Sequence, residues 1–127
     1  MKKSINAWAF PNEMTFEDIF ETAKKYGFEA IELNVDAVGA NKHSFNYDST
    51  EADFKKVLDL EKKYGIEVQS VSTGLYWSTG AFASENPEKR AEALKVLRTQ
   101  LRCAKALGRI LCRFVVKFVP VDFINCV

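Results

Sequence analysis

The chain has 127 residues, of which 47% are hydrophobic and 28% are charged, and its formal net charge at pH 7 is +1. This length corresponds to one domain, and the apolar content is high enough for a packed core, which argues against an intrinsically disordered chain. Acidic and basic residues are interleaved, so neither a nucleic-acid-binding stripe nor an acidic tail is indicated.

The three cysteines, Cys103, Cys112 and Cys126, form no CxxC pair. An odd number of unclustered cysteines is typical of free thiols in a reducing compartment, so we expect a cytoplasmic protein. The single histidine, His43, is far from them in sequence, and we expect no zinc site and a solvated His43. No apolar run approaches the roughly 20 residues of a membrane helix, and we expect no membrane association.

The segment Ser4–Phe10 is predicted to be the opening strand. A helix follows, because Thr15 and Asp18 have capping-box spacing and Lys24-Lys25 with Gly27 is typical of a helix end. Its apolar residues recur at helical spacing: Phe16, Ile19, Phe20, Ala23 and Tyr26.

The next run, Ala30–Val35, alternates as a strand does. Ile31, Leu33 and Val35 occupy one face of this strand. Glu32 and Asn34 occupy the other face.

The pattern then repeats, with Thr50 and Asp53 at the start of a second helix and Gly65 at its end. The apolar face of this helix is predicted to be Phe54, Val57, Leu58 and Tyr64, with Leu60 off the face. A third strand is predicted over Val68–Thr73.

The third helix begins at Asn86, a good cap, with Pro87 at the first helical position, and it ends at Gly108. Its apolar stripe is predicted to be Ala91, Leu94, Leu97, Leu101, Ala104 and Leu107. A fourth strand is expected in Ile110–Val119. The order β-α-β-α-β-α-β implies an α/β fold with a parallel sheet and right-handed crossovers.

Functional side chains of α/β proteins gather at the carboxyl ends of the strands, which makes Glu32 and Asn34 the leading candidates here. They point away from the predicted helix layer, so a substrate or supporting contact is one interpretation. A structural carboxylate bonded to a neighbouring strand is the other. Thr73, at the end of the third strand, is a further candidate for the pocket.

Aromatic residues are the other candidates. Trp8 and Phe10 alternate with alanines and are predicted either to line a small-ligand pocket or to fill the core. Trp77, in the loop from Gly74 to Gly80, belongs either to a lid over a ligand or to a loop packed by its own aromatic residues.

Three stretches resemble the xylose isomerase-like TIM barrels, which include sugar phosphate isomerases and epimerases, hydroxypyruvate isomerases and an endonuclease branch. Gly27-Phe28-Glu29-Ala30-Ile31-Glu32-Leu33 is similar to their second strand and Gly65 to Ser72 to their third. Ala104-Lys105-Ala106-Leu107-Gly108 is similar to the end of their third helix. The endonuclease branch has a histidine where this chain has Ser72 and Thr73, so the nuclease reading is disfavoured.

The resemblance implies the N-terminal β-α-β-α-β-α-β portion of a (β/α)8 barrel, incomplete in 127 residues. It also implies metal-assisted proton transfer next to a carbonyl of a sugar or sugar phosphate, with a divalent metal such as Mn, Mg, Co or Zn. The family's metal ligands come from later strands, so no metal is expected to be bound by residues of this chain. Glu32 corresponds to the family's second-strand carboxylate.

We therefore expect a single partial barrel domain over residues 1–127, family-like to residue 108 and with an atypical tail over residues 109–127. We expect it to be inactive alone as an isomerase or epimerase of carbohydrate metabolism. The alternative is a non-catalytic half-barrel module that assembles with a partner chain. A flavodoxin-like domain is disfavoured, because no phosphate-cradling loop follows the first strand. Open barrel edges predict self-association.

Overall fold

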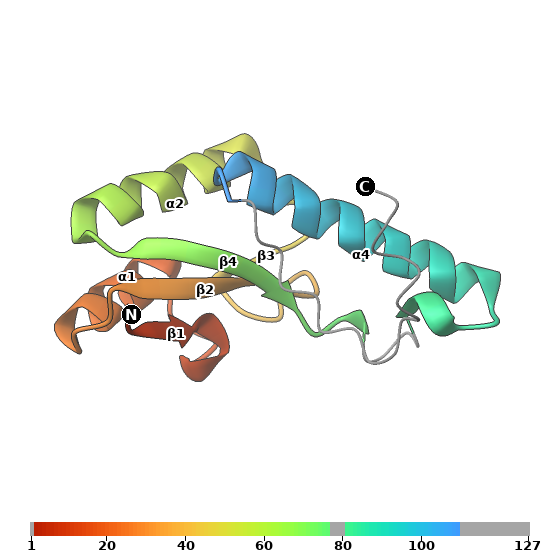
Figure 1. Ribbon diagram of the computed structural model, residues 1–127, viewed down its shortest axis with the longest axis horizontal. Coiled ribbons are helices and arrows are strands. Elements are labelled where there is room, and N and C mark those ends of the chain that lie inside the picture. The colour runs from red at the N-terminus through yellow and green to blue at the C-terminus, as the bar shows by residue number, and fades with distance from the viewer. Residues whose placement is uncertain (1, 77–80, 110–127) are drawn as a thin grey trace.

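The computed structural model describes residues 2–76 and 81–109 of the chain (Figure 1). The elements are β1 Ser4–Asn6, η1 Ala7–Ala9, α1 Phe16–Lys25, β2 Ala30–Val35, β3 Ser44–Phe45, α2 Glu51–Tyr64, β4 Glu67–Thr73, η2 Ala81–Ala83 and α4 Pro87–Ala106. The predicted α/β class is confirmed, and the three main helices, α1, α2 and α4, lie where the sequence predicted them. The fourth strand expected over 110–119 and the residue Trp77 lie outside the described residues. No helix of the described part is long and apolar enough to cross a membrane.

The sheet is parallel throughout and is organised around β2. Ser4 to Asn6 of β1 pair with Ala30 to Glu32, and the two residues of β3 pair with the end of β2. Strand β4 pairs with the whole length of β2. Strand β3 lies in the long loop that follows β2 and was not expected from the sequence.

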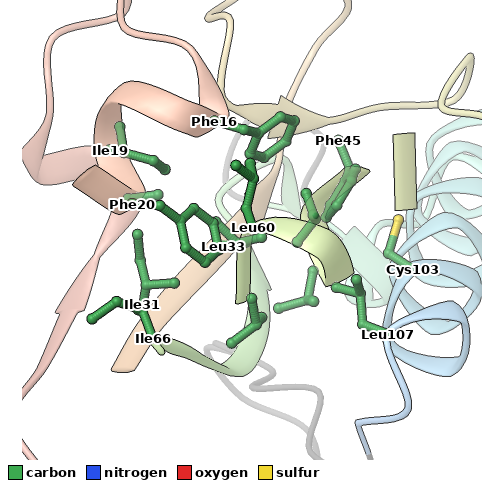
Figure 2. Packing of buried hydrophobic residues seen from close by; sticks show 14 of the residues in the cluster. Phe16, Ile19, Phe20, Ile31, Leu33, Phe45, Leu60, Ile66, Cys103 and Leu107 are labelled. Atoms are coloured by element: carbon green, nitrogen blue, oxygen red, sulfur yellow. The ribbon is translucent and has the colours of Figure 1, made fainter. Parts of the chain in front are cut away.

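One face of this sheet and the three main helices enclose the hydrophobic core (Figure 2). The ribbon in Figure 1 shows α2 and α4 along the same side of the sheet. The core residues from the strands are Ile31, Leu33, Val35, Phe45, Val68 and Val71, and those from α1 are Phe16, Ile19, Phe20 and Ala23. The predicted orientation of the β2 aliphatic residues toward the helices is therefore confirmed.

Two predicted helix faces need correction. The buried face of α4 consists of Ala93, Val96, Thr99, Gln100, Cys103 and Ala104, whereas Leu94 and Leu101 are 44% and 49% exposed. The polar Gln100 is buried because its side-chain amide donates to the carbonyl of Val71 at 2.8 Å, which anchors α4 to β4. In α2, Leu60 is buried together with Phe54 and Val57, so it belongs to the apolar face.

The opening strand is also shorter than predicted, because it ends at Asn6. The Asn6 side chain accepts a hydrogen bond from the backbone N–H of Trp8 at 2.8 Å and starts the 3-10 turn η1. Asparagine side chains compete in this way with strand pairing. Trp8 and Phe10 therefore lie on a turn at the carboxyl end of β1, not on the strand.

His43 is buried, at 1% exposure, and is not the solvated loop residue expected from the sequence. Its Nδ1 lies 2.8 Å from the carbonyl oxygen of Met14, and its Nε2 lies 3.1 Å from that of Ala7. The ring of Phe10 packs edge-on against it. The imidazole thus ties the loop after β2 to both ends of the β1–α1 connection, including the turn that carries Trp8.

Replacing His43 with alanine is expected to lower the free energy of unfolding by about 2–4 kcal/mol, because it removes the polar contacts of the ring and leaves a cavity. Urea denaturation followed by circular dichroism measures this change. The control Lys42→Ala, at an exposed neighbouring side chain, is expected to cost less than about 0.5 kcal/mol. Equal effects of the two substitutions would contradict the bridging role of His43.

The capping box at the start of α1 is present as predicted. The backbone N–H and the hydroxyl of Thr15 donate to the Asp18 carboxylate at 2.7 and 2.8 Å, and they hold the pKa of this carboxyl below its ordinary value of 3.8. A lowered pKa in the folded state means that the contact stabilises the protein above the unfolded pKa. This stabilisation is lost as the pH falls through the folded pKa.

We expect the difference in Tm between the wild type and Asp18→Asn to shrink as the pH falls from about 6 to about 3, because protonation removes the same contact. Thermal unfolding at several pH values measures it. The control Asp59→Asn, at an exposed position on α2, is expected to show no such narrowing. A pH-independent difference for Asp18→Asn would argue against a role of the ionised cap.

Candidate functional site

The sheet face that is turned away from the helices carries polar side chains. They come from three neighbouring strands: Asn6 from β1, Glu32 and Asn34 from β2, and Ser70 and Ser72 from β4. The backbone register places Asn6, Glu32 and Ser70 side by side, and Asn34 beside Ser72. Each member contacts at least one other member, so we call these five residues the inner-face network.

Both carboxylate oxygens of Glu32 accept hydrogen bonds within this network. The Asn6 Nδ2 donates to Oε1 at 2.7 Å, and the Ser70 hydroxyl donates to Oε2 at 2.5 Å. Both donors are neutral, so the half-buried charge of Glu32 is oriented without being neutralised. Within the described residues no cation pairs with it.

Asn34 is 1% exposed and continues the network toward the carboxyl end of β2. Its Oδ1 accepts from the Ser72 hydroxyl at 2.6 Å, and its Nδ2 donates to Asn6 Oδ1 at 3.2 Å. When the amide is rotated by 180°, its nitrogen donates to Ser72, and its oxygen accepts from the backbone and indole N–H groups of Trp8 at 3.2 Å each. In either orientation Asn34 is held on both sides.

Trp8 lies at the edge of the network, where it is 49% exposed. Its indole Nε1 donates to the carboxylate oxygens of Asp36 at 3.1 and 3.2 Å, and Asn41 donates to the same carboxylate at 3.0 Å. An aromatic side chain held by its polar end presents a fixed apolar surface to solvent. Trp8 is therefore placed to contact a ligand over the network.

The other candidates from the sequence are placed differently. Phe10 is buried and belongs to the hydrophobic core, which agrees with the core-filling interpretation. The hydroxyl of Thr73 donates to the Val35 carbonyl at 2.7 Å and accepts from the N–H of Leu75 at 3.2 Å. Thr73 thus closes the end of the β2–β4 ladder, and its role in a pocket stays a prediction.

Asn6, Ser70, Ser72 and Asp36 belong to the site but were not among the candidates. Strand β1 has only 3 residues, too few for alternation to predict which face of the sheet Asn6 lies on. Asn6 lies beside Glu32 because of the parallel register between β1 and β2, which no local signal in the sequence sets. The serines were not predicted because Gln69 is an extra residue in the β2–β4 register and shifts the alternation of β4.

The chemistry of the inner-face network is that of a polar binding surface. Amides, hydroxyls and one carboxylate offer both donors and acceptors to a ligand rich in hydroxyl groups, and Trp8 offers an apolar ring face. The described residues contain no group of three His, Cys, Asp or Glu side chains that could hold a metal ion. The described part of the chain therefore does not by itself fit the metal that the resemblance implies, and no step is derived through it.

The known proteins that resemble this chain agree on its architecture. The profile of the xylose isomerase-like TIM barrel family matches residues 20–122. A solved structure, a xylose isomerase domain containing protein from Salmonella typhimurium LT2, superposes with a TM-score of 0.58 at 22% sequence identity. The alignment covers 87% of this chain and 35% of that protein, so the chain spans about a third of its length. No curated protein sequence matches the chain.

The family profile covers most of the chain. The matched part includes β2 and β4, which carry four of the five inner-face residues, and α4, which lies over the sheet. The superposition supports the same strand order in three dimensions. This chain belongs to the xylose isomerase-like TIM barrel family.

Proposed function

We propose that this chain provides the N-terminal substrate-binding wall of a sugar or sugar phosphate isomerase or epimerase. The observation that carries the proposal is the inner-face network with the exposed Trp8 beside it. In a closed barrel this face turns toward the lumen, and family active sites lie at the carboxyl ends of the strands. The residues of the wall would orient a polyhydroxylated substrate.

In this proposal, Glu32 accepts from a substrate hydroxyl while Asn6 and Ser70 hold the carboxylate in place. The ring face of Trp8 packs against the C–H groups of the substrate, an arrangement that suits the mixed polar and apolar faces of a sugar. Proton transfer next to a carbonyl, assisted by a divalent metal, belongs to the complete barrel. The chain alone would bind without turnover, in the cytoplasm.

The test is a fluorescence titration of the Trp77→Phe variant, in which Trp8 is the single remaining tryptophan, with an aldopentose and its 5-phosphate. We expect saturable quenching, and we expect Glu32→Gln to weaken binding about tenfold or more, as for a hydrogen bond to a charged group. The control Glu21→Gln removes the same charge from an exposed position on α1 and is expected to leave affinity unchanged.

Two outcomes would overturn the proposal: no saturable quenching with either ligand, or equal losses for Glu32→Gln and Glu21→Gln. Circular dichroism of each variant shows whether the fold is retained. Isomerase turnover by the purified chain with Mn²⁺ or Mg²⁺ would contradict the expectation that the chain is inactive by itself. It would not contradict the proposed binding wall.

A non-catalytic half-barrel that assembles with a partner chain is the second candidate. It is favoured by the sheet edge, because β4 hydrogen-bonds to no strand of the described part other than β2. An open edge exposes backbone N–H and C=O groups that another strand can pair with.

We expect the isolated chain to form concentration-dependent dimers through this edge, as measured by analytical ultracentrifugation. Gln69→Lys, at an exposed position of β4, adds a charge to this edge without changing the backbone and is expected to weaken the dimer. A monodisperse monomer that melts cooperatively at all concentrations would contradict self-association.

A further inference from the structure

A second concave surface lies on the helix side of the sheet, away from the inner-face network. It is a cleft of about 290 Å³ between α4 and the loop that follows β3. The residues that line it are Tyr47, Ala91, Lys95, Arg98, Thr99 and Arg102. The lining residues from α4 follow one stripe of the helix. The small side chain of Ala91 leaves one end of the cleft open.

Tyr47 forms a fixed wall of this cleft because α4 contacts it at three points. The Tyr47 hydroxyl donates to Glu92 at 2.6 Å, the Lys95 ammonium lies 4.1 Å from the ring centroid, and Arg102 donates to the backbone carbonyl of Tyr47 at 3.2 Å. Burial and the hydrogen bond to Glu92 raise the pKa of Tyr47 to about 12. The ring therefore stays neutral at physiological pH.

The cleft is lined by three cations and by no carboxylate. Glu92 accepts a hydrogen bond from the Tyr47 hydroxyl and does not line the cleft. Arg98 is exposed and makes no hydrogen bond or ion pair within residues 2–76 and 81–109. Its guanidinium is thus available, while Lys95 and Arg102 are already oriented by Tyr47.

A cleft between α1 and α2 provides the contrast. It is larger, at about 380 Å³, and it also carries three lysines. Two carboxylates, Glu17 and Asp59, line it as well, and Lys63 pairs with Glu17 at 2.6 Å. The charged groups that line it therefore sum to +1, against +3 in the cleft beside Tyr47.

We propose that the cleft beside Tyr47 binds a small ligand that carries a diphosphate group. The rise of an α-helix separates Lys95 from Arg98 by about 4.5 Å and Arg98 from Arg102 by about 6 Å along the axis, so two adjacent phosphates would meet two or three cations. The planar guanidinium of Arg98 matches a phosphate with two parallel hydrogen bonds. The volume is at the low end for ligand sites, which favours a compact anion.

The test uses inorganic pyrophosphate as the probe, with orthophosphate for comparison, titrated into the full chain and followed by ¹H–¹⁵N NMR. We expect saturable shifts at residues 95–102 and at Tyr47, no shifts at Ser70 and Ser72, and at least tenfold weaker binding of orthophosphate. Arg98→Glu is expected to weaken pyrophosphate binding at least tenfold, because it removes a charge-assisted contact and adds repulsion.

The matched control is Lys89→Glu, which makes the same charge change on α4 at an exposed residue outside the cleft. We expect it to change affinity less than about twofold at physiological salt, where exposed charges are screened. Equal losses for the two variants would overturn the site in favour of general charge attraction. Absence of saturable binding, or binding of a long polyanion such as heparin without binding of pyrophosphate, would also overturn it.

Discussion

Strands β2 and β4 are paired in parallel over the full length of β2, with one irregularity in the register between Ile31 and Glu32. Ile31 is opposite Val68, but Glu32 is opposite Ser70, so Gln69 is an extra residue on β4. A bulge of this kind shifts the alternation of a strand by one position. Because of it, Val68 and Val71 both enter the core, and Ser70 and Ser72 both join the inner-face network. If Gln69 were paired as a regular strand residue, Val68 and Val71 would lie on opposite faces of the sheet.

The inner-face network depends on this register because its members satisfy one another. A buried amide such as Asn34 would cost free energy if its polar atoms had no partners. Ser72 and Asn6 supply these partners across two strand pairs. The side chains are therefore held on a rigid sheet, and their positions do not require a bound ligand. This preorganisation is what a binding surface needs in order to avoid ordering its side chains at each binding event.

Local signals in the sequence predicted the helices and the two faces of β2, because capping residues, glycines and alternation act within a few residues. Features that depend on contacts between distant segments were not predictable in this way. Asn6 contacts Glu32 across the β1–β2 pair, and Gln100 is buried because it reaches the Val71 carbonyl. The apolar stripe predicted for α4 was wrong at Ala91, Leu94 and Leu101 for the same reason, whereas Ala104 and Leu107 are buried as predicted. Apolar character does not distinguish Leu94 from Val96, and Val96 is covered because it packs in a cluster with Tyr76, a contact between distant segments.

The two polar surfaces differ in the physics of recognition that each can support. The inner-face network has neutral donors and acceptors and one carboxylate, and Trp8 lies beside it with an aromatic ring. The selectivity of this surface would therefore come from matching the hydroxyl pattern of a ligand. The cleft beside Tyr47 has three cations on one helix stripe, so its selectivity would come from charge density. The sheet separates them, and α4 is held on both of its sides, because Gln100 is bonded to β4 while Lys95 and Arg102 contact Tyr47 on the outer side. Each surface therefore keeps its geometry without a ligand in the other.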